Sequence, residues 1–212
     1  MPTFQTPGPI AITADIPSGE VKVIASGRTD TVVTVRPADP SEKDDVRAAD
    51  QVRIDYAAGH LSVVTPKSWR TYTPFGGNPT IEVIIEAPTG SQLRATAGMG
   101  RLSSTGELGD CDLEIAAGDI EVGRTTGSVT AKTSKGDIRI AEATRGTLHL
   151  ETSMGELEVG ITPGSAAQLE SNTQHGSVQN QLQPVSPTTK DIVHVHARNS
   201  YGNIIIRHAN AA

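Results

Sequence analysis

Residues from Gly100 onward repeat a short pattern of alternating polar and apolar positions. Most of the repeats open with glycine, as in GDIEV at 118–122 and GELEV at 155–159. Such alternation predicts a short β-strand with one face toward the core, closed by a turn that uses glycine. One such strand cannot bury its apolar face alone, so the repeats predict a stack of strands, a β-solenoid. The glycines that mark the repeats stand at positions 100, 109, 118, 127, 136, 146, 155 and 164.

The spacing of these glycines also predicts which residues are neighbours. Two units of nine residues make one coil, so residues 18 or 19 apart should lie side by side in adjacent coils. At this spacing apolar residues fall in register on both sides of the coil, and a slip of one residue would turn every stack toward solvent. The predicted core stacks are Ile120–Ile138–Leu157, Val122–Ile140–Val159, Cys111–Val129–Leu148 and Leu113–Ala131–Leu150.

The first 97 residues contain strands of ordinary length in place of the repeat. A charged stretch at 41–51 lacks glycine and predicts one or two helical turns. Short connections favour antiparallel pairing. Hairpin loops are predicted at 27–30 and 58–60, and a turn at Pro17-Ser18-Gly19. The predicted strands cover 10–16, 20–25, 31–36, 52–57, 61–65 and 80–86.

Together these patterns predict an all-β chain. An N-terminal antiparallel β segment over 1–97 should cap, and continue into, a short β-solenoid of nine-residue strand–turn repeats over 98–212. The two regions should form one continuous fold.

Charge and composition exclude several classes of protein. The net charge of −6 argues against an electrostatic grip on nucleic acid or an anionic membrane. The single cysteine, Cys111, allows no internal disulfide and occupies an apolar position of the repeat, so we expect a buried thiol. We see no signal peptide and no apolar run long enough for membrane insertion. A cytoplasmic location is the simplest interpretation.

The repeat string resembles a known bacterial family. GDIEV, GSVTA, GDIRI, GTLHL and GELEV follow one another between 118 and 159, with KSWRTYTPFGG at 67–77 and SYGNIIIR at 200–207. This combination resembles a family of β-strand-repeat proteins of unknown function that are often labelled candidate adhesins. The loop and the ending are similar to actinobacterial members, in which an N-terminal β segment precedes the repeats. The resemblance implies a β-solenoid-like fold and no catalytic residues.

An aromatic loop is the first candidate binding site. Trp69, Tyr72 and Phe75 lie close together beside Arg70, although the whole chain has only six aromatic residues. Aromatic side chains beside a cation suit a protein interface, or stacking on a sugar or base. The alternative is a plug that covers the open end of the sheet.

Outward-facing carboxylates form a second candidate. Asp119, Asp137 and Glu156 should stack about 5 Å apart, where a divalent cation could bridge them. The alternative is a solvated acidic face, which we favour because no repeat has the glycine pattern of calcium-binding nonapeptides. His194 and His196 share one strand face, which is half of a possible zinc site with His208 as a third ligand of uncertain register. The alternative, which we favour, is that the odd-numbered positions Val193, Val195 and Ala197 form the buried face and leave both histidines in water.

Catalysis has little support in the sequence. It contains no nucleophile elbow, zinc-protease motif, phosphate-binding loop or dinucleotide fingerprint. We therefore expect no enzyme, no cofactor and no resident metal. The favoured hypothesis is a binding or scaffold module with an unknown protein or glycan partner. The alternatives are a self-associating structural solenoid and a carbohydrate-active β-helix enzyme.

Overall fold

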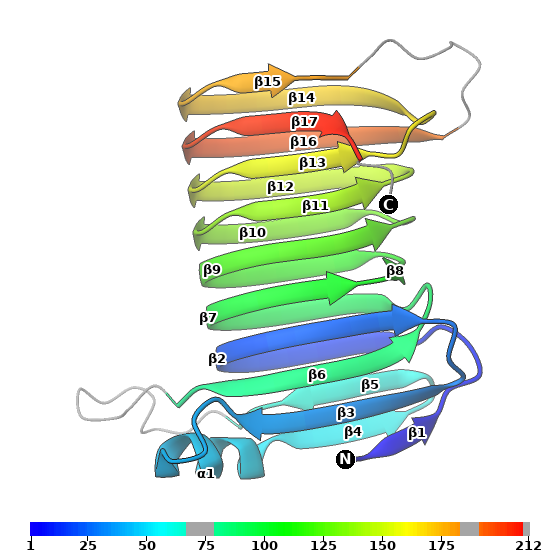
Figure 1. Cartoon of the computed structure of the whole chain (residues 1–212), viewed down its shortest axis with the longest axis vertical. Coiled ribbons are helices and arrows are strands. Elements are labelled where there is room, and N and C mark those ends of the chain that lie inside the picture. The colour runs from blue at the N-terminus through cyan, green and yellow to red at the C-terminus, as the bar shows by residue number, and fades with distance from the viewer. Residues whose placement is uncertain (67–78, 183–190, 210–212) are drawn as a thin grey trace.

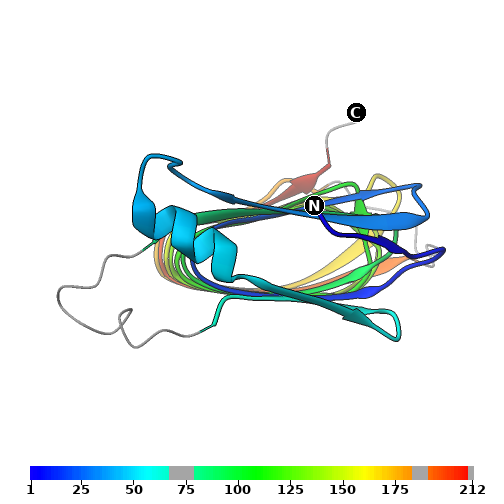
Figure 2. The ribbon, with the colours of Figure 1, turned by 90° about the horizontal axis from the view of Figure 1, so that it is seen from below.

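A computed structural model describes residues 1–66, 79–182 and 191–209, which form one tall stack of strands (Figure 1). The strands belong to a single 17-stranded sheet that winds around an elongated interior, as the view from below shows (Figure 2). No helix of the described residues is long and apolar enough to cross a membrane. In chain order the elements are β1 (Thr3–Gln5), β2 (Ala11–Ser26), β3 (Asp30–Pro37), α1 (Lys43–Gln51), β4 (Arg53–Ala57), β5 (His60–Val64), β6 (Ile81–Pro88), β7 (Gln92–Thr105), β8 (Glu107–Leu108), β9 (Cys111–Thr125), β10 (Val129–Lys135), β11 (Ile138–Ala143), β12 (Gly146–Met154), β13 (Leu157–Ile161), β14 (Ala166–His175), β15 (Val178–Asn180), β16 (Ile192–Tyr201) and β17 (Ile204–His208).

The core stacks of the repeat region have the predicted register. Val129 lies opposite Cys111 on β9 and opposite Leu148 on β12, in parallel pairing. Ile138 lies in the same way between Ile120 and Leu157. These side chains are buried and form part of one continuous hydrophobic core. The alternation of apolar and polar positions therefore determines which side of each strand faces the interior.

Glycines form a column along the edge where each coil turns a corner, either within one long strand or between two shorter ones. Their backbone lies so close to the coil below that a side chain has no room. A Cβ atom on Gly136, for example, would lie 2.0 Å from the carbonyl oxygen of Gly118. Each of these glycines has a positive φ, which L side chains rarely adopt. From one end of the stack to the other, the column consists of Gly19, Gly100, Gly118, Gly136, Gly155, Gly202 and Gly176.

Buried polar side chains line the inside of this edge. Thr152 donates from Oγ1 to the carbonyl oxygen of Gly136 at 3.0 Å, and Asn199 donates from Nδ2 to that of Gly155 at 3.1 Å. Thr133 makes the equivalent bond to Gly118 at 3.2 Å. Because a buried carbonyl without a partner is costly, these bonds explain why polar residues are tolerated inside the solenoid.

The prediction of an antiparallel segment over 1–97 is wrong for its longest strand. β2 pairs in parallel with β5, β6 and β7, and its Gly19 lies opposite Gly100. The Pro17-Ser18-Gly19 turn is therefore a corner within one strand, and β2 already belongs to the solenoid. The predicted hairpin at 27–30 does not form, because β6 lies between β2 and β3.

Among the described strands, antiparallel pairing is confined to the lower end of the stack in Figure 1. There β3 pairs with β6 and β1, and β4 pairs with β5 as the predicted hairpin at 58–60 requires. The predicted helical turns are present as α1, which buries Ala48 against the core. These elements cover this end of the solenoid.

The other end of the stack departs from the order of the sequence. The last coil of the chain, β16 and β17, lies between the coil of β12 and β13 and the coil of β14 and β15. Val195 on β16 is consequently a neighbour of both Leu148 and Leu169. The inward positions of β14 include Ser171 and Thr173, and this strand is largely exposed. A polar coil suits the end of a repeat stack, whereas the apolar coil of β16 suits its interior.

Candidate functional site

The candidate aromatic residues Trp69, Arg70, Tyr72 and Phe75 lie outside the described residues. Their role in binding or in plugging the sheet therefore stays a prediction.

The carboxylates of the acidic ladder bind backbone N–H groups. Asp119 accepts from the N–H of Asp137 at 3.0 Å, and Asp137 accepts from the N–H of Glu156 at 2.8 Å. Arg101 lies 3.6 Å from Asp119 as well. These contacts show how neighbouring carboxylates are tolerated in this ladder. No group of three or more acidic, histidine or cysteine side chains suited to a metal ion occurs among the described residues.

The histidines of the predicted half zinc site lie on one face of β16, but His208 does not join them. His208 is on β17, opposite Ile161 in the other half of the coil. The ring of His196 instead stacks on that of His149 on β12, with ring centroids 4.7 Å apart. Its Nδ1 lies 3.0 Å from a carboxylate oxygen of Glu170 on β14. The three neighbouring strands thus build a row of polar side chains.

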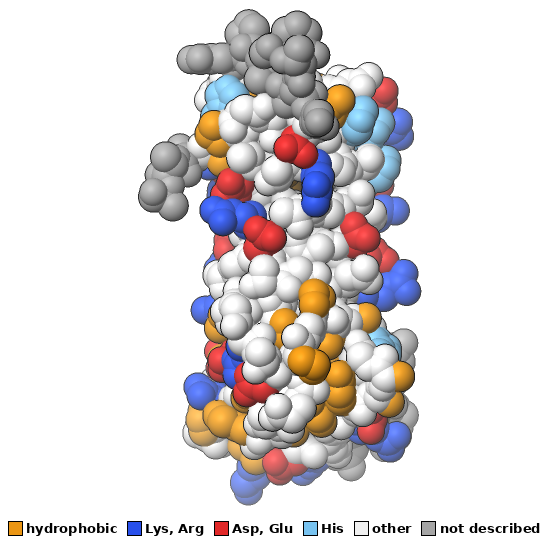
Figure 3. Space-filling view, turned by 90° about the vertical axis from the view of Figure 1, so that its right-hand side faces the viewer, with side chains coloured by type: hydrophobic (Ala, Val, Ile, Leu, Met, Phe, Trp, Pro, Cys, Tyr) orange, Lys and Arg blue, Asp and Glu red, His pale blue; other side chains and the backbone are white. Residues whose placement is uncertain are grey.

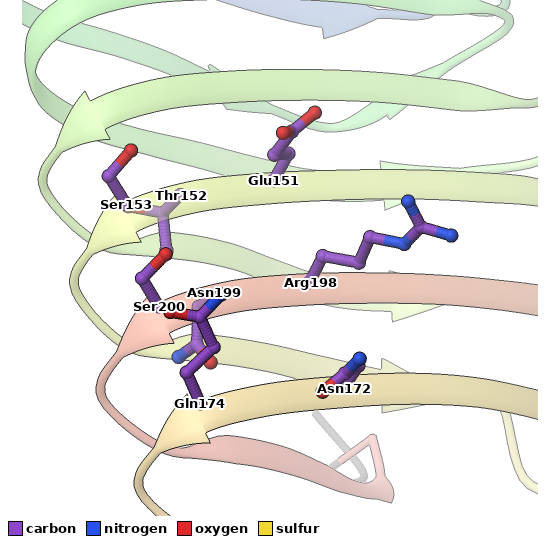
Figure 4. A pocket seen from close by; sticks show the side chains of 8 residues that line it. All are labelled: Glu151, Thr152, Ser153, Asn172, Gln174, Arg198, Asn199 and Ser200. Carbon is purple, nitrogen blue, oxygen red and sulfur yellow. The ribbon is translucent and has the colours of Figure 1, made fainter.

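This row belongs to a hollowed polar strip on the outer surface of β10, β12, β16 and β14. A hollow of about 390 Å³ lies over β12, β16 and β14 (Figure 4). A second hollow of about 360 Å³ extends toward β10. Glu151 and Arg198 line both hollows, which makes the strip continuous. We call it the polar track and define it by Lys132, His149, Glu151, Ser153, Asn172, Gln174, His196, Arg198 and Ser200.

Strand alternation and the inserted last coil together create the polar track. Along β16 the side chains of His196, Arg198 and Ser200 point outward, because the intervening Ala197 and Asn199 point into the core. Register places Arg198 between Glu151 on β12 and Asn172 on β14. Without the insertion of β16 between these strands, the groups of the track would not meet.

Arg198 differs from the other arginines of the solenoid coils. Their guanidinium groups are bound to carboxylates, except that of Arg145, which donates to the carbonyl of Thr126. Within the described residues Arg198 has no ion pair and no hydrogen bond from its side chain, although it lies in the middle of the track. The ion-paired arginines are Arg94, Arg101, Arg124, Arg139 and Arg207.

Charge elsewhere on the molecule is mixed in sign. On the edge that Figure 3 shows, acidic and basic side chains are interspersed, and hydrophobic side chains gather in the lower half. This edge therefore offers no broad field of one sign.

Stacked rings lie at both ends of the track. His149 and His196 stack within it at one end, and Tyr201 stacks on His175 beyond the other end, with ring centroids again 4.7 Å apart. Tyr201 is 53% exposed in a chain that has few aromatic residues. Exposed rings of this kind present an apolar surface beside a polar rim.

The side chains of the track are hydrogen-bonding groups. It offers hydroxyl, amide, carboxylate and cationic groups in neighbouring rows. The single cysteine lies elsewhere in the core, and burial raises the pKa of the Cys111 thiol to about 12. Cys111 is therefore a core residue, not a nucleophile.

Sequence reasoning missed the track because its strands are far apart in the chain. Thr147 on β12 and His194 on β16 lie side by side on neighbouring strands although they are 47 positions apart in the sequence, a separation that no repeat spacing predicts. A signal was present nevertheless. The ending Tyr201-Gly202-Asn203 has the same pattern as Met154-Gly155-Glu156, and the two glycines are neighbours in the column.

Comparisons with known proteins agree with this architecture. The model of the Toastrack DUF4097 family matches residues 10–205. A candidate cell adhesion protein from Clostridium sporogenes superposes with a TM-score of 0.51 at 14% identity, covering 98% of each chain. A candidate adhesin from Bacteroides fragilis gives a TM-score of 0.50 at 14% identity, covering 97% of this chain and 95% of its own. At such identities the likeness shows the fold alone. No curated protein matches the sequence.

Proposed function

We propose that this chain, which belongs to the Toastrack DUF4097 family, is a non-enzymatic binding module that holds an extended glycan on the polar track. The observation that carries this proposal is the strip of hydroxyl, amide and charged groups over β10, β12, β16 and β14, with stacked rings at both ends. The adhesion-related names of the similar folds are compatible with a binding role.

The groups of the track suit a sugar polymer. A sugar hydroxyl both donates and accepts, and the track presents donors and acceptors in neighbouring rows, such as Asn172, Gln174 and Ser200. The rows repeat at the strand spacing of about 4.8 Å, so an extended ligand meets a polar group in each successive strand of the track. The exposed ring of Tyr201 adds an apolar surface for the carbon–hydrogen face of a sugar.

Binding to a panel of immobilised glycans tests this proposal. Replacing both Asn172 and Gln174 by alanine should abolish retention of any glycan that the wild-type protein binds. The matched control replaces the exposed Gln179 and Gln181, on the other half of the same coil, and should leave retention unchanged. Equal effects of the two double variants, or retention of no glycan by the wild type, would contradict the proposal. Cleavage of a retained glycan would contradict the non-enzymatic role.

The predicted aromatic loop enters the proposal as a second contact. Its basis is the sequence alone, which gathers Trp69, Tyr72 and Phe75 in one short segment. A folded triple alanine variant that loses a retained partner supports a binding loop, whereas a variant that no longer folds indicates a plug. Circular dichroism distinguishes the two results.

A further inference from the structure

We infer that the polar track recognises an acidic glycan and that Arg198 binds the carboxylate of its sugar. This inference rests on the proposed function and specifies the class of ligand.

The first argument is the contrast between Arg198 and Arg94. Both point outward from the half of a coil that precedes the glycine corner, Arg198 on β16 before Gly202 and Arg94 on β7 before Gly100. Arg94 donates twice to a carboxylate oxygen of Asp112, at 2.7 and 3.0 Å. Arg198 has no such partner among the described residues, although Glu151 lies opposite it in the register. Its guanidinium group is therefore available for a carboxylate that comes from outside the protein.

The second argument is the position of Arg198 within the hollows. It lines both of them, with Asn172 on one neighbouring strand and Glu151 on the other (Figure 4). A guanidinium group binds a carboxylate through two parallel hydrogen bonds, which fixes the orientation of the acid as well as its charge. The neutral amide and hydroxyl side chains that line the same hollow suit the hydroxyls of the same sugar.

The third argument concerns the other charges of the track. Lys132 lines the second hollow and adds a second cation, while Glu151 accepts hydrogen bonds but repels an acid. The net charge of the chain is −6, so attraction of a polyanion has to come from these local cations and not from the whole molecule. Replacing Glu151 by glutamine should therefore strengthen binding of an acidic polymer.

The test compares polygalacturonate with the same polymer after methyl esterification, which removes the charge and keeps the backbone. The wild-type protein should bind the acidic form about tenfold more tightly, as expected for one charge-assisted contact. Arg198→Gln should reduce this preference to about one, and Arg198→Lys should keep part of it. Arg94→Gln removes the same charge from an ion pair outside the track and should change the preference less than twofold.

The outcomes separate the inference from the proposed function. If the wild-type protein retains neutral glycans or the ester as well as it retains the acid, the inference is wrong and the glycan-binding proposal stands. Retention of no glycan at all would overturn both. An equal loss of preference in the Arg94 and Arg198 variants would show a general effect of charge and overturn the role of Arg198.

Discussion

Replacing Gly136 by alanine tests the glycine column that forms one edge of the solenoid. The new Cβ would lie 2.0 Å from the carbonyl oxygen of Gly118, where real Cβ contacts are essentially never under 3.0 Å. The two coils must therefore separate locally by about 1 Å. This separation weakens two hydrogen bonds, from Thr133 Oγ1 to Gly118 O and from Ile120 N to Asp137 O.

The expected cost follows from two contributions. A residue other than glycine held at the φ of +145° costs about 2 kcal/mol. The two weakened hydrogen bonds contribute about 1 kcal/mol each. The free energy of unfolding should therefore fall by about 4 kcal/mol, which corresponds to roughly 10 °C in the melting temperature of a chain of this size.

Thermal unfolding measured by circular dichroism checks this value against two matched glycines. Gly164 has a φ of +94°, but a Cβ added there would meet no atom within 4 Å, so Gly164→Ala should show only the conformational cost of about 2 kcal/mol. Gly27 has neither a positive φ nor a close neighbour, so Gly27→Ala should change stability by less than about 1 kcal/mol. If Gly136→Ala melts at the same temperature as Gly164→Ala, close packing of the coils is not what requires glycine in the column.

Two further predictions concern titratable groups. Burial alone would raise the pKa of Glu158, but hydrogen bonds from Arg139 and Arg207 outweigh it and lower the pKa below its ordinary value. Glu158→Gln should therefore reduce the free energy of unfolding by about 1 kcal/mol at pH 7, and this difference from the wild type should disappear as pH falls through the folded-state pKa of Glu158. Urea unfolding of both proteins at pH 7 and pH 3 measures the difference. An undiminished difference at pH 3 would contradict the reasoning. Burial raises the pKa of the Cys111 thiol from 9.0 to about 12. The thiol therefore ionises at a lower pH in the unfolded state than in the folded state, and the free energy of unfolding should fall as pH rises above 9. At pH 8 the thiol should react with a disulfide reagent only after unfolding, and reaction at the rate of free cysteine would show that it is accessible.

The sequence predicts the repeat coils well because their periodicity is local. Ile120, Ile138 and Leu157 are consecutive in the stack and 18 or 19 apart in the chain, so register follows from spacing. β2 shows the limit of this reasoning. Its Gly19 lies opposite Gly100. The segment between the two glycines contains the antiparallel cap, so no fixed repeat spacing predicts that they are neighbours.

The polar track could not be predicted for the same reason. Its central residue, Arg198, reaches Glu151 and Asn172 only because the last coil inserts between two earlier ones. Alternation along 192–201 did predict that the even-numbered side chains face outward, since Val193, Val195 and Ala197 are buried. Which strands lie beside them depends on tertiary pairing between segments that the chain order does not place together.

The inserted coil also has a consequence for how the protein is made. During synthesis the strands β14 and β15 leave the ribosome before β16 and β17, yet among the described strands of the native stack they pair only with these later strands and not with β12 or β13. The growing chain can form its native coils in order as far as β13, but the native partner strands of β14 and β15 do not yet exist at that point. Native closure of the upper end therefore awaits residues 192–208.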